Sequence, residues 1–312
     1  MEKIILEKLK KCFNTNKISV LLKIKTGIEN DNYIVLVDDK KYVFRIYNNK
    51  HSIRGKRTIN SIEMELQFMK FVKKYDIPVL KLIECFDGKL VHEIQVDRVG
   101  RLFIISKYIE GKIVKKYTKN SSRAVGVIVN NLLNASCNFQ TGKEIALNNT
   151  IFNRTKIIFD KLMSENKDNI VAYVKDTYNE LMLERQEVIN KNLVRGIIHG
   201  DIKLDNILFD ESESSVLVLL DFDDYRYTFL IEEIMSALMH DLHSLNKNII
   251  RSGNYKQFMQ EINIDLIGSD MKHLKHFLKT RLVYNLCNYI LEDKIELVNE
   301  VLRDKNINRW VL

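Results

Sequence analysis

The strongest constraint on the fold of this chain is a change in the spacing of its apolar residues at Glu110-Gly111. Before this point, short apolar runs separated by turn residues are typical of β-strands, and after it apolar positions recur every three or four residues, as in helices. The chain has 312 residues, one proline and no low-complexity linker, so a short hinge must join the two parts. We therefore predict an α+β protein with a β-rich lobe at 1–107, a hinge at 108–111 and a mainly helical lobe at 112–312.

The first part has the pattern of a sheet with one helix. Two runs, Tyr33–Val37 and Tyr42–Tyr47, flank the turn Asp38-Asp39-Lys40 and predict a β-hairpin. A helix is expected from Ile59 to Tyr75, where apolar residues recur at helical spacing, and it should end at Asp76-Ile77-Pro78. The other predicted strands are Ile18–Ile24, Val79–Phe86, Leu90–Val96 and Leu102–Lys107.

The second part is helical except for one embedded hairpin. Its clearest helix is expected from about Asn169 to Asn190. The hairpin strands are predicted at Asn206–Phe209 and Val216–Leu220, with the acidic turn Asp210–Ser215 between them.

Composition limits the partners of the chain. The net charge is +8, but lysine is spread along the whole sequence and no basic stripe alternates with aromatic residues, so we expect no nucleic-acid partner. No apolar run approaches membrane-spanning length, and the N-terminus resembles an amphipathic helix rather than a signal peptide. We expect a cytoplasmic monomer or homodimer without a membrane partner.

Cysteine and histidine spacing predicts no zinc site, because no C-x-x-C and no zinc-type Cys/His cluster occurs. The cysteines are interpreted as buried small apolar residues in a reducing compartment: Cys12, Cys85, Cys137 and Cys287. Three histidines without an identifiable partner are interpreted as ordinary core or surface residues: His92, His240 and His243.

Two acidic motifs flank the embedded hairpin. His199–Asn206 reads H-G-D-I-K-L-D-N, and Asp221–Asp224 reads D-F-D-D directly after an apolar strand. Carboxylates after a buried strand are costly unless a cation compensates them, and Mg²⁺ prefers one or two carboxylates together with phosphate oxygens. Either motif alone is typical of a turn or a solvated loop. The two in this order predict phosphoryl transfer, which needs positioning and charge neutralisation more than covalent catalysis.

The motifs divide the catalytic work. Asp201 would accept the proton of the attacking hydroxyl or orient it. Asn206 and Asp221 would hold Mg²⁺ against the phosphates of ATP, and His199 would brace the catalytic loop by hydrogen bonding. Lys203 would neutralise the transferring phosphoryl group, or is a solvated loop lysine.

Three further carboxylates, Asp205, Asp223 and Asp224, are candidate substrate residues. They would suit an acceptor with ammonium groups if they face it, and otherwise they cap the loop.

The order H-G-D-x-x-x-x-N, strand, D-F-D-D resembles the aminoglycoside phosphotransferase and choline kinase superfamily, whose members have the bilobal fold of protein kinases. Protein kinases carry H-R-D, so Gly200 points to the small-molecule branch. The resemblance covers about Gly27 to Met235 and implies ATP and Mg²⁺ as cofactors and a hydroxyl compound as acceptor.

The resemblance extends to residues that would bind the nucleotide. Gly27 and Asn30 lie in G-I-E-N-D-N-Y, which is similar to the nucleotide-covering loop of type II homoserine kinases of this superfamily. Arg45 stands where many relatives have lysine, and Glu65 matches the helix glutamate that would pair with it. Since the guanidinium of arginine is planar and carries several N–H donors, whereas the ammonium of lysine is compact, the phosphate contact of Arg45 should differ from that of a lysine.

Two other places complete the resemblance. The run I-S-K-Y-I-E-G, with Ser106 and Tyr108, resembles the hinge whose backbone hydrogen-bonds adenine. Glu233 lies where relatives more often have aspartate with a bracing role.

These residues predict transfer of the γ-phosphate of ATP to a hydroxyl of a small molecule such as an aminoglycoside, amino sugar or amino alcohol. One alternative is an atypical bacterial Ser/Thr protein kinase, which shares H-G-D and D-x-D-D. Another is a non-catalytic nucleotide-binding scaffold, such as a spore-coat relative. The intact Asp201, Asn206 and Asp221 argue against the scaffold, because a scaffold needs neither a base nor metal ligands.

Overall fold

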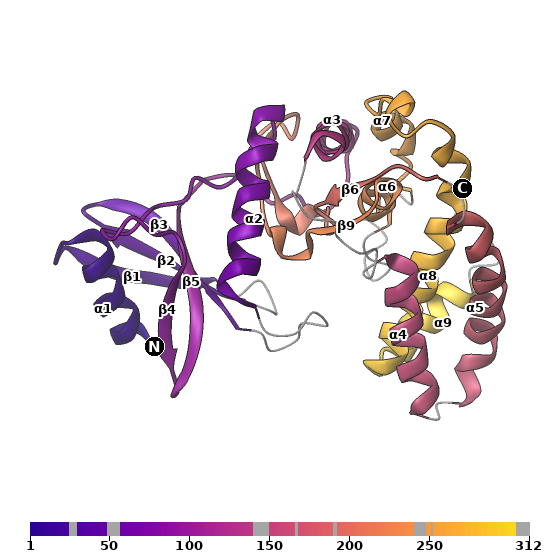
Figure 1. Ribbon diagram of the computed structural model, residues 1–312, viewed down its shortest axis with the longest axis horizontal. Helices are drawn as coiled ribbons and strands as arrows, with labels where there is room; N and C mark the ends of the chain where they lie inside the picture. Colours follow the sequence, from indigo (N-terminus) through magenta and orange to yellow (C-terminus); the bar gives the residue numbers. More distant parts are fainter. Residues whose placement is uncertain are drawn as a thin grey trace. The chain divides into compact units, whose positions relative to one another are not determined.

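The computed structural model describes residues 1–24, 30–48, 57–139, 150–165, 168–189, 192–239, 248–250 and 252–303. The chain forms two compact units, of which the first contains 1–70 and 79–110 and the second contains 71–78 and 111–312 (Figure 1). None of the helices in these described ranges combines the length and the apolar character needed to cross a membrane.

The first unit is built on a five-stranded antiparallel sheet of order β1-β2-β3-β5-β4. Its strands are β1 (Ile18–Ile24), β2 (Asn30–Val37), β3 (Lys40–Tyr47), β4 (His92–Val96) and β5 (Val99–Lys107). The predicted hairpin is confirmed, because Val37 pairs with Lys40 across a two-residue turn. Both turn residues, Asp38 and Asp39, have positive φ (46° and 62°), which fits the right-handed twist of the flanking strands.

Helix α1 (Glu2–Phe13) packs on this sheet through its apolar face. Ile5 and Leu9 are fully buried in one cluster with Phe44 and Phe103, whose rings stack with centroids 4.5 Å apart. Burial of each such aliphatic side chain contributes about 1.5–3 kcal/mol. The N-terminal segment is thus an amphipathic helix, as the sequence predicts.

Helix α2 (Ile59–Val72) confirms the predicted helix of the first part and continues into a 3₁₀ turn, η1 (Lys73–Tyr75). It begins with a reciprocal cap, in which Ser61 N donates to Thr58 Oγ1 (3.2 Å) and Thr58 N donates to Ser61 Oγ (3.0 Å). The predicted apolar face is buried: Ile62, Leu66, Met69 and Val72. The same helix carries Glu65.

The predicted strand at Val79–Phe86 is wrong. This segment has isolated bridges at Val79 and Leu82, of which Leu82 pairs with Ser106, and the next regular strand begins at His92. The end of the segment bends into a tight turn, in which Cys85 N donates to Lys89 O (2.9 Å) and Gly88 has a φ of +76°. A strand cannot extend through this reversal of the chain.

The cysteines are predicted to be buried and reduced, and burial is confirmed for Cys12 and Cys85, whereas their reduced state is not. Cys12 at the end of α1 and Cys85 in the turn form a disulfide, and Cys137 is exposed, contrary to the prediction. Cys287 is a buried free cysteine, as predicted.

The second unit is mainly helical and contains two small β-pairs. Its helices are α3 (Lys119–Asn138), α4 (Ile151–Ser164), α5 (Asp168–Ile189), α6 (Ile231–Leu238), α7 (Tyr255–Met259), α8 (Leu274–Leu291) and α9 (Ile295–Arg303). Within this unit α4 and α5 both pack on α8 (Figure 1). The predicted long helix at Asn169–Asn190 is confirmed as α5.

The embedded hairpin is confirmed as β7 (Ile207–Phe209) paired with β8 (Val216–Leu219). A second pair, β6 (Arg195–Ile198) with β9 (Arg226–Phe229), is not predicted from sequence, because four-residue strands show too little periodicity. The two acidic motifs lie in the segments that connect these strands.

Candidate active site

The two acidic motifs meet at one end of the β7–β8 hairpin. Asn206 directly precedes β7 and Leu220 directly follows β8, and Leu220 N donates to Asn206 O (2.8 Å). Asp221 comes next in a left-handed conformation (φ 59°, ψ 64°) and opens the 3₁₀ turn η3 (Phe222–Asp224). The hairpin therefore brings the H-G-D and D-F-D-D motifs together, although Asp221 lies fifteen positions after Asn206 in the sequence (221 − 206).

Asp201 is held in place by two neighbours in its own motif. Asn206 Nδ2 donates to the backbone oxygen of Asp201 (2.9 Å) and to its Oδ2 (2.7 Å), and Lys203 Nζ lies 2.9 Å from the same Oδ2. These bonds use only the amide nitrogen of Asn206. Its carbonyl oxygen is therefore the atom suited to a hard cation such as Mg²⁺.

His199 has the contacts expected of a brace. A carbonyl oxygen can only accept, so the ring donates from Nε2 to Leu220 O (2.9 Å), and Nδ1 accepts from Asp201 N (3.2 Å). The ring also packs edge-on against Phe222, with centroids 4.5 Å apart. Burial lowers the pKa of His199, so the imidazole is neutral and joins both motifs through one fixed tautomer.

Lys203 is charged and partly covered. The pKa of Lys203 is raised. Burial by itself would lower this pKa, but the charge and hydrogen bond of Asp201 and the charge of Asp221 outweigh the effect of burial. A cation stably held beside the proposed base fits the predicted charge-neutralising role better than a solvated loop lysine does.

Glu233, at the start of α6, binds the backbone of the H-G-D loop. Its Oε2 accepts from His199 N (2.6 Å) and Gly200 N (3.3 Å), so the longer side chain still reaches the loop. Burial raises the pKa of Glu233 to about 7, against the opposing effects of Arg226 and of the two N–H donors.

The glycine of H-G-D is required by a close neighbour. Gly200 has a φ of +77°, and a β-carbon there would overlap the guanidinium of Arg226 and lie 2.8 Å from Asp224 O. The sequence comparison of H-G-D with H-R-D did not identify Arg226. An arginine between two tyrosines, two positions after D-F-D-D, was the available signal of a buried cation.

Arg226 belongs to a buried network that joins the motifs to α4. Arg226 Nη2 donates to Glu232 Oε2 (3.2 Å), and Arg226 Nη1 lies 3.4 Å from Asp224 Oδ2. Arg154 Nη1 also donates to Asp224 Oδ2 (3.1 Å), and Glu232 accepts from Ile151 N at the start of α4 (3.1 Å). The first role of Asp224 is therefore to compensate two arginines, and its contact with an acceptor stays a prediction. Asp223 is buried and Asp205 is exposed.

An aromatic and cationic group lies next to this network, between α4 and α8. Arg154 and Arg281 lie over the ring of Tyr284, at 5.6 Å and 5.2 Å from its centroid. Burial lowers the pKa of Arg281. The negative charge of Asp201 is among the effects that oppose this shift, so Arg281 interacts electrostatically with the proposed base. Sequence reasoning did not identify these residues, because single charged residues in amphipathic helices carry no motif.

The predicted phosphate-binding residues lie in the first unit. Glu65 pairs with Arg57 just before α2, and Tyr47 Oη donates to Glu65 Oε1 (3.5 Å). Arg45 lies on β3 with its guanidinium 5.3 Å from the centre of the Tyr47 ring. Arg57 is a partner of Glu65 that the sequence did not predict, and the pairing of Glu65 with Arg45 stays a prediction.

The predicted hinge and covering loop also lie in the first unit. Tyr108 N donates to Lys41 O (3.3 Å), and Ser106 is buried in β5 opposite Val43. Asn30 begins β2, whereas Gly27 lies outside the described residues.

The comparison with known families decides the classification. The model of the phosphotransferase enzyme family matches residues 20–256, which include every motif described above. This chain belongs to the phosphotransferase enzyme family. The predicted resemblance is confirmed. A curated relative of this phosphotransferase is the homoserine kinase of Zymomonas mobilis, 23% identical over 189 residues. That match covers 60% of this chain and about half (54%) of the relative's own length.

Solved structures confirm the kinase-like fold of the phosphotransferase. An amicoumacin kinase, solved with AMP-PNP and Ca²⁺, matches with a TM-score of 0.67 at 17% identity over 98% of this chain and 94% of its own. A microcompartment-associated aminopropanol kinase matches with a TM-score of 0.66 at 15% identity over 95% and 93%. A spectinomycin phosphotransferase solved with ADP and spectinomycin matches with a TM-score of 0.61 at 15% identity over 99% and 92%.

Proposed function

We propose that this chain transfers the γ-phosphate of ATP to a hydroxyl group of a small molecule of the amino alcohol, amino sugar or aminoglycoside class. The observation that carries the proposal is the cluster around Asp201, in which Lys203 and Asn206 both bind its Oδ2. These contacts hold the Asp201 carboxylate in a fixed position, from which it would accept a proton from an attacking hydroxyl.

The oxygen donors at the end of the hairpin fit a magnesium ion. Asn206 would supply its carbonyl oxygen and Asp221 its carboxylate, and oxygen ligands of this kind are what Mg²⁺ prefers. When bound with ATP, the ion supplies neutralisation of the charge that develops on the phosphates. Lys203 would add a second positive charge on the side of the base.

The first unit would contribute nucleotide contacts. Arg45 is proposed to bind phosphate oxygens through its planar guanidinium, with Asn30 and Gly27 in the loop that covers them. Ser106 and Tyr108 are proposed to mark the adenine-binding segment. The Tyr108 N–H already donates to Lys41 O. Adenine would therefore be recognised through backbone atoms that follow the Tyr108 N–H in the chain.

The relatives support a small-molecule acceptor. The homoserine kinase and the aminopropanol kinase are named for amino alcohols, and the spectinomycin enzyme for an antibiotic. A cytoplasmic location remains our prediction, since ATP is available there.

A panel assay tests the proposed function. Release of ADP would be measured with MgATP and single acceptors: aminoglycosides, choline, ethanolamine, homoserine and hexosamines. We expect one chemical class to stimulate release strongly in the parent and not in Asp201→Asn. Transfer of phosphate to protein hydroxyls with no small-molecule stimulation would favour the protein-kinase alternative. Nucleotide binding without any transfer would favour the scaffold.

A further inference from the structure

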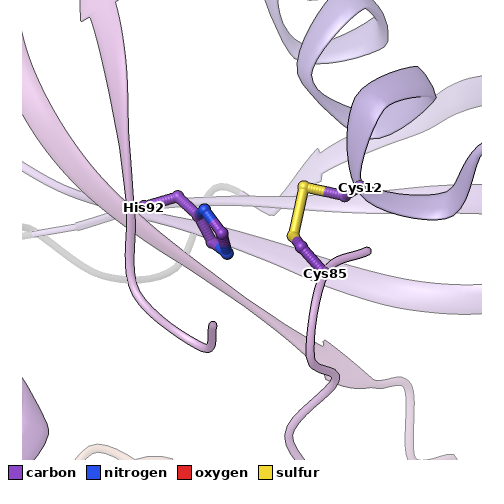
Figure 2. A group of neighbouring side chains, drawn as sticks. All are labelled: Cys12, Cys85 and His92. Atoms are coloured by element: carbon purple, nitrogen blue, oxygen red, sulfur yellow. A yellow bond between two sulfur atoms is a disulfide. The ribbon is translucent and has the colours of Figure 1, made fainter. Parts of the chain in front are cut away.

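A second cluster of reactive side chains lies in the first unit. Cys12, Cys85 and His92 come from α1, from the turn before β4 and from β4, and their ligand atoms lie within 4.8 Å of one another. Figure 2 shows the imidazole of His92 pointing toward the two bonded sulfur atoms. Sequence spacing predicts no such cluster, because 73 residues separate the two cysteines.

We propose that Cys12, Cys85 and His92 form a zinc-binding site that is available when the two sulfurs are reduced and closed when they form the disulfide. Two thiolates and one imidazole are typical zinc ligands. In a tetrahedral site with Zn–S bonds of about 2.3 Å, the sulfur atoms lie about 3.8 Å apart, so small side-chain shifts would convert the present cluster into a metal site.

The hydrogen bonding of His92 fits a metal ligand. Its Nε2 lies 3.0 Å from Lys89 O, and because a carbonyl can only accept, this nitrogen carries the proton. Nδ1 then presents a lone pair. Histidines that bind metals almost always donate their second nitrogen to a carbonyl or carboxylate, which fixes the tautomer. The ring also stacks on Phe103, with centroids 5.3 Å apart, which restricts its orientation.

The surroundings provide access and room for a fourth ligand. Asp87 Oδ1 accepts from Lys89 N (3.1 Å) and lies 3.7 Å from His92 Nε2, the nitrogen that faces away from the ion, so water would supply the fourth ligand. The site opens into a cavity of about 400 Å³ that also contacts Lys8 and Lys11. These two cations lower the cost of forming thiolates, which are the metal-binding form of cysteine.

The disulfide form and the reduced, zinc-bound form interconvert by thiol–disulfide exchange followed by metal binding. A dithiol reductant breaks the S–S bond by supplying two electrons and two protons, and is itself oxidised to a disulfide. Zn²⁺ then displaces the two thiol protons. In the reverse direction an oxidised disulfide reagent accepts two electrons from the thiolates and becomes a dithiol, and the ion is released as the S–S bond forms.

Metal binding to the full chain tests the proposal. The protein would be reduced with a phosphine under argon, freed of reductant, and mixed with Zn²⁺ or with Co²⁺ as a spectroscopic probe. We expect about one ion per chain, with the thiolate-to-cobalt absorption of a tetrahedral site. The disulfide form should retain no ion. Failure of the reduced chain to bind zinc, or persistence of the disulfide under phosphine, would overturn the proposal.

Matched variants locate the ion. His92→Gln keeps both cysteines and should weaken zinc binding by at least about tenfold, as should Cys85→Ser. Cys137→Ser removes a thiol of the second unit and should leave binding unchanged. If Cys85→Ser fails to fold, His92→Gln still decides, because it leaves the disulfide available. Equal zinc affinity in His92→Gln and the parent contradicts the site. None of these readouts depends on kinase activity.

Discussion

The guanidinium of Arg226 occupies the space that a β-carbon on Gly200 would need. The same arginine is paired with Asp224 and Glu232, so it cannot move aside without leaving buried charges uncompensated. The glycine of the catalytic loop is thus fixed by packing against the segment that follows D-F-D-D as well as by its own backbone conformation.

Gly200→Ala should lower the free energy of unfolding by more than the cost of placing alanine at a positive φ. Gly253 is the matched control, because its φ (+74°) is close to that of Gly200 (+77°) and nothing lies within 4 Å of a β-carbon there. Gly253→Ala should cost about 1 kcal/mol, and Gly200→Ala about 1–3 kcal/mol more, from overpacking. Urea denaturation of both variants measures the difference. Equal losses would show that Arg226 adapts.

Protonation of Glu233 should affect stability between about pH 4.5 and pH 7. Burial raises its pKa from 4.5 to about 7, so the folded state binds this proton more tightly than the unfolded chain does. The stabilising contribution is complete below pH 4.5 and is lost as pH rises through 7. Glu233→Gln stays neutral, so at pH 8 it should exceed the parent in unfolding free energy by up to about 3 kcal/mol.

Comparing the parent with Glu233→Gln isolates the contribution of Glu233 protonation to the unfolding free energy. His199 acts in the opposite direction, because its lowered pKa gives a contribution that is present above pH 6.5 and lost as pH falls below it. That contribution is the same in the parent and in Glu233→Gln. Denaturation at pH 5 and at pH 8 gives the difference in unfolding free energy between Glu233→Gln and the parent at each pH. Glu63→Gln, at an exposed position, is the control. A variant no more stable relative to the parent at pH 8 than at pH 5 would disprove the raised pKa.

Arg45→Ala should reduce stabilisation by nucleotide. A ligand that binds only the folded state raises the melting temperature by mass action, and loss of a phosphate contact weakens binding. We expect millimolar MgATP to raise the Tm of the parent and to raise that of Arg45→Ala less. Lys81→Ala removes an exposed cation from the same unit and should behave like the parent. The phosphate assignment is wrong if Arg45→Ala and the parent shift equally.

Elements with strong periodicity could be predicted from sequence, and contacts between distant segments could not. The apolar spacing of Ile62, Leu66, Met69 and Val72 is sufficient for α2, because one helical face must be buried. The Asn206–Asp221 neighbourhood follows from a short hairpin whose two strands end at the same place. By contrast, the Gly200–Arg226 contact depends on how β9 pairs with β6, and no local pattern encodes it.

The division of labour between Asp201 and Asp221 gives the sharpest test of the mechanism. Asp201→Asn should leave MgATP binding nearly intact, because this carboxylate is proposed to contact only the acceptor hydroxyl. Turnover should fall by something on the order of 10²- to 10⁴-fold, the usual contribution of a general base. The amide oxygen can still accept from Lys203 and Asn206, which both bind Oδ2 in the parent, so the loop should stay folded.

Asp221→Asn should instead impair binding and turnover together, because the cation that neutralises the phosphates loses a charged ligand. Titration of MgATP followed by Tm or fluorescence gives binding, and ADP release with an authentic acceptor gives turnover. Raising the Mg²⁺ concentration should partly restore Asp221→Asn and have no effect on Asp201→Asn, since only the first defect is one of metal affinity. Parental turnover in Asp201→Asn would remove the base assignment. Undiminished MgATP affinity in Asp221→Asn would place the metal on other oxygen atoms.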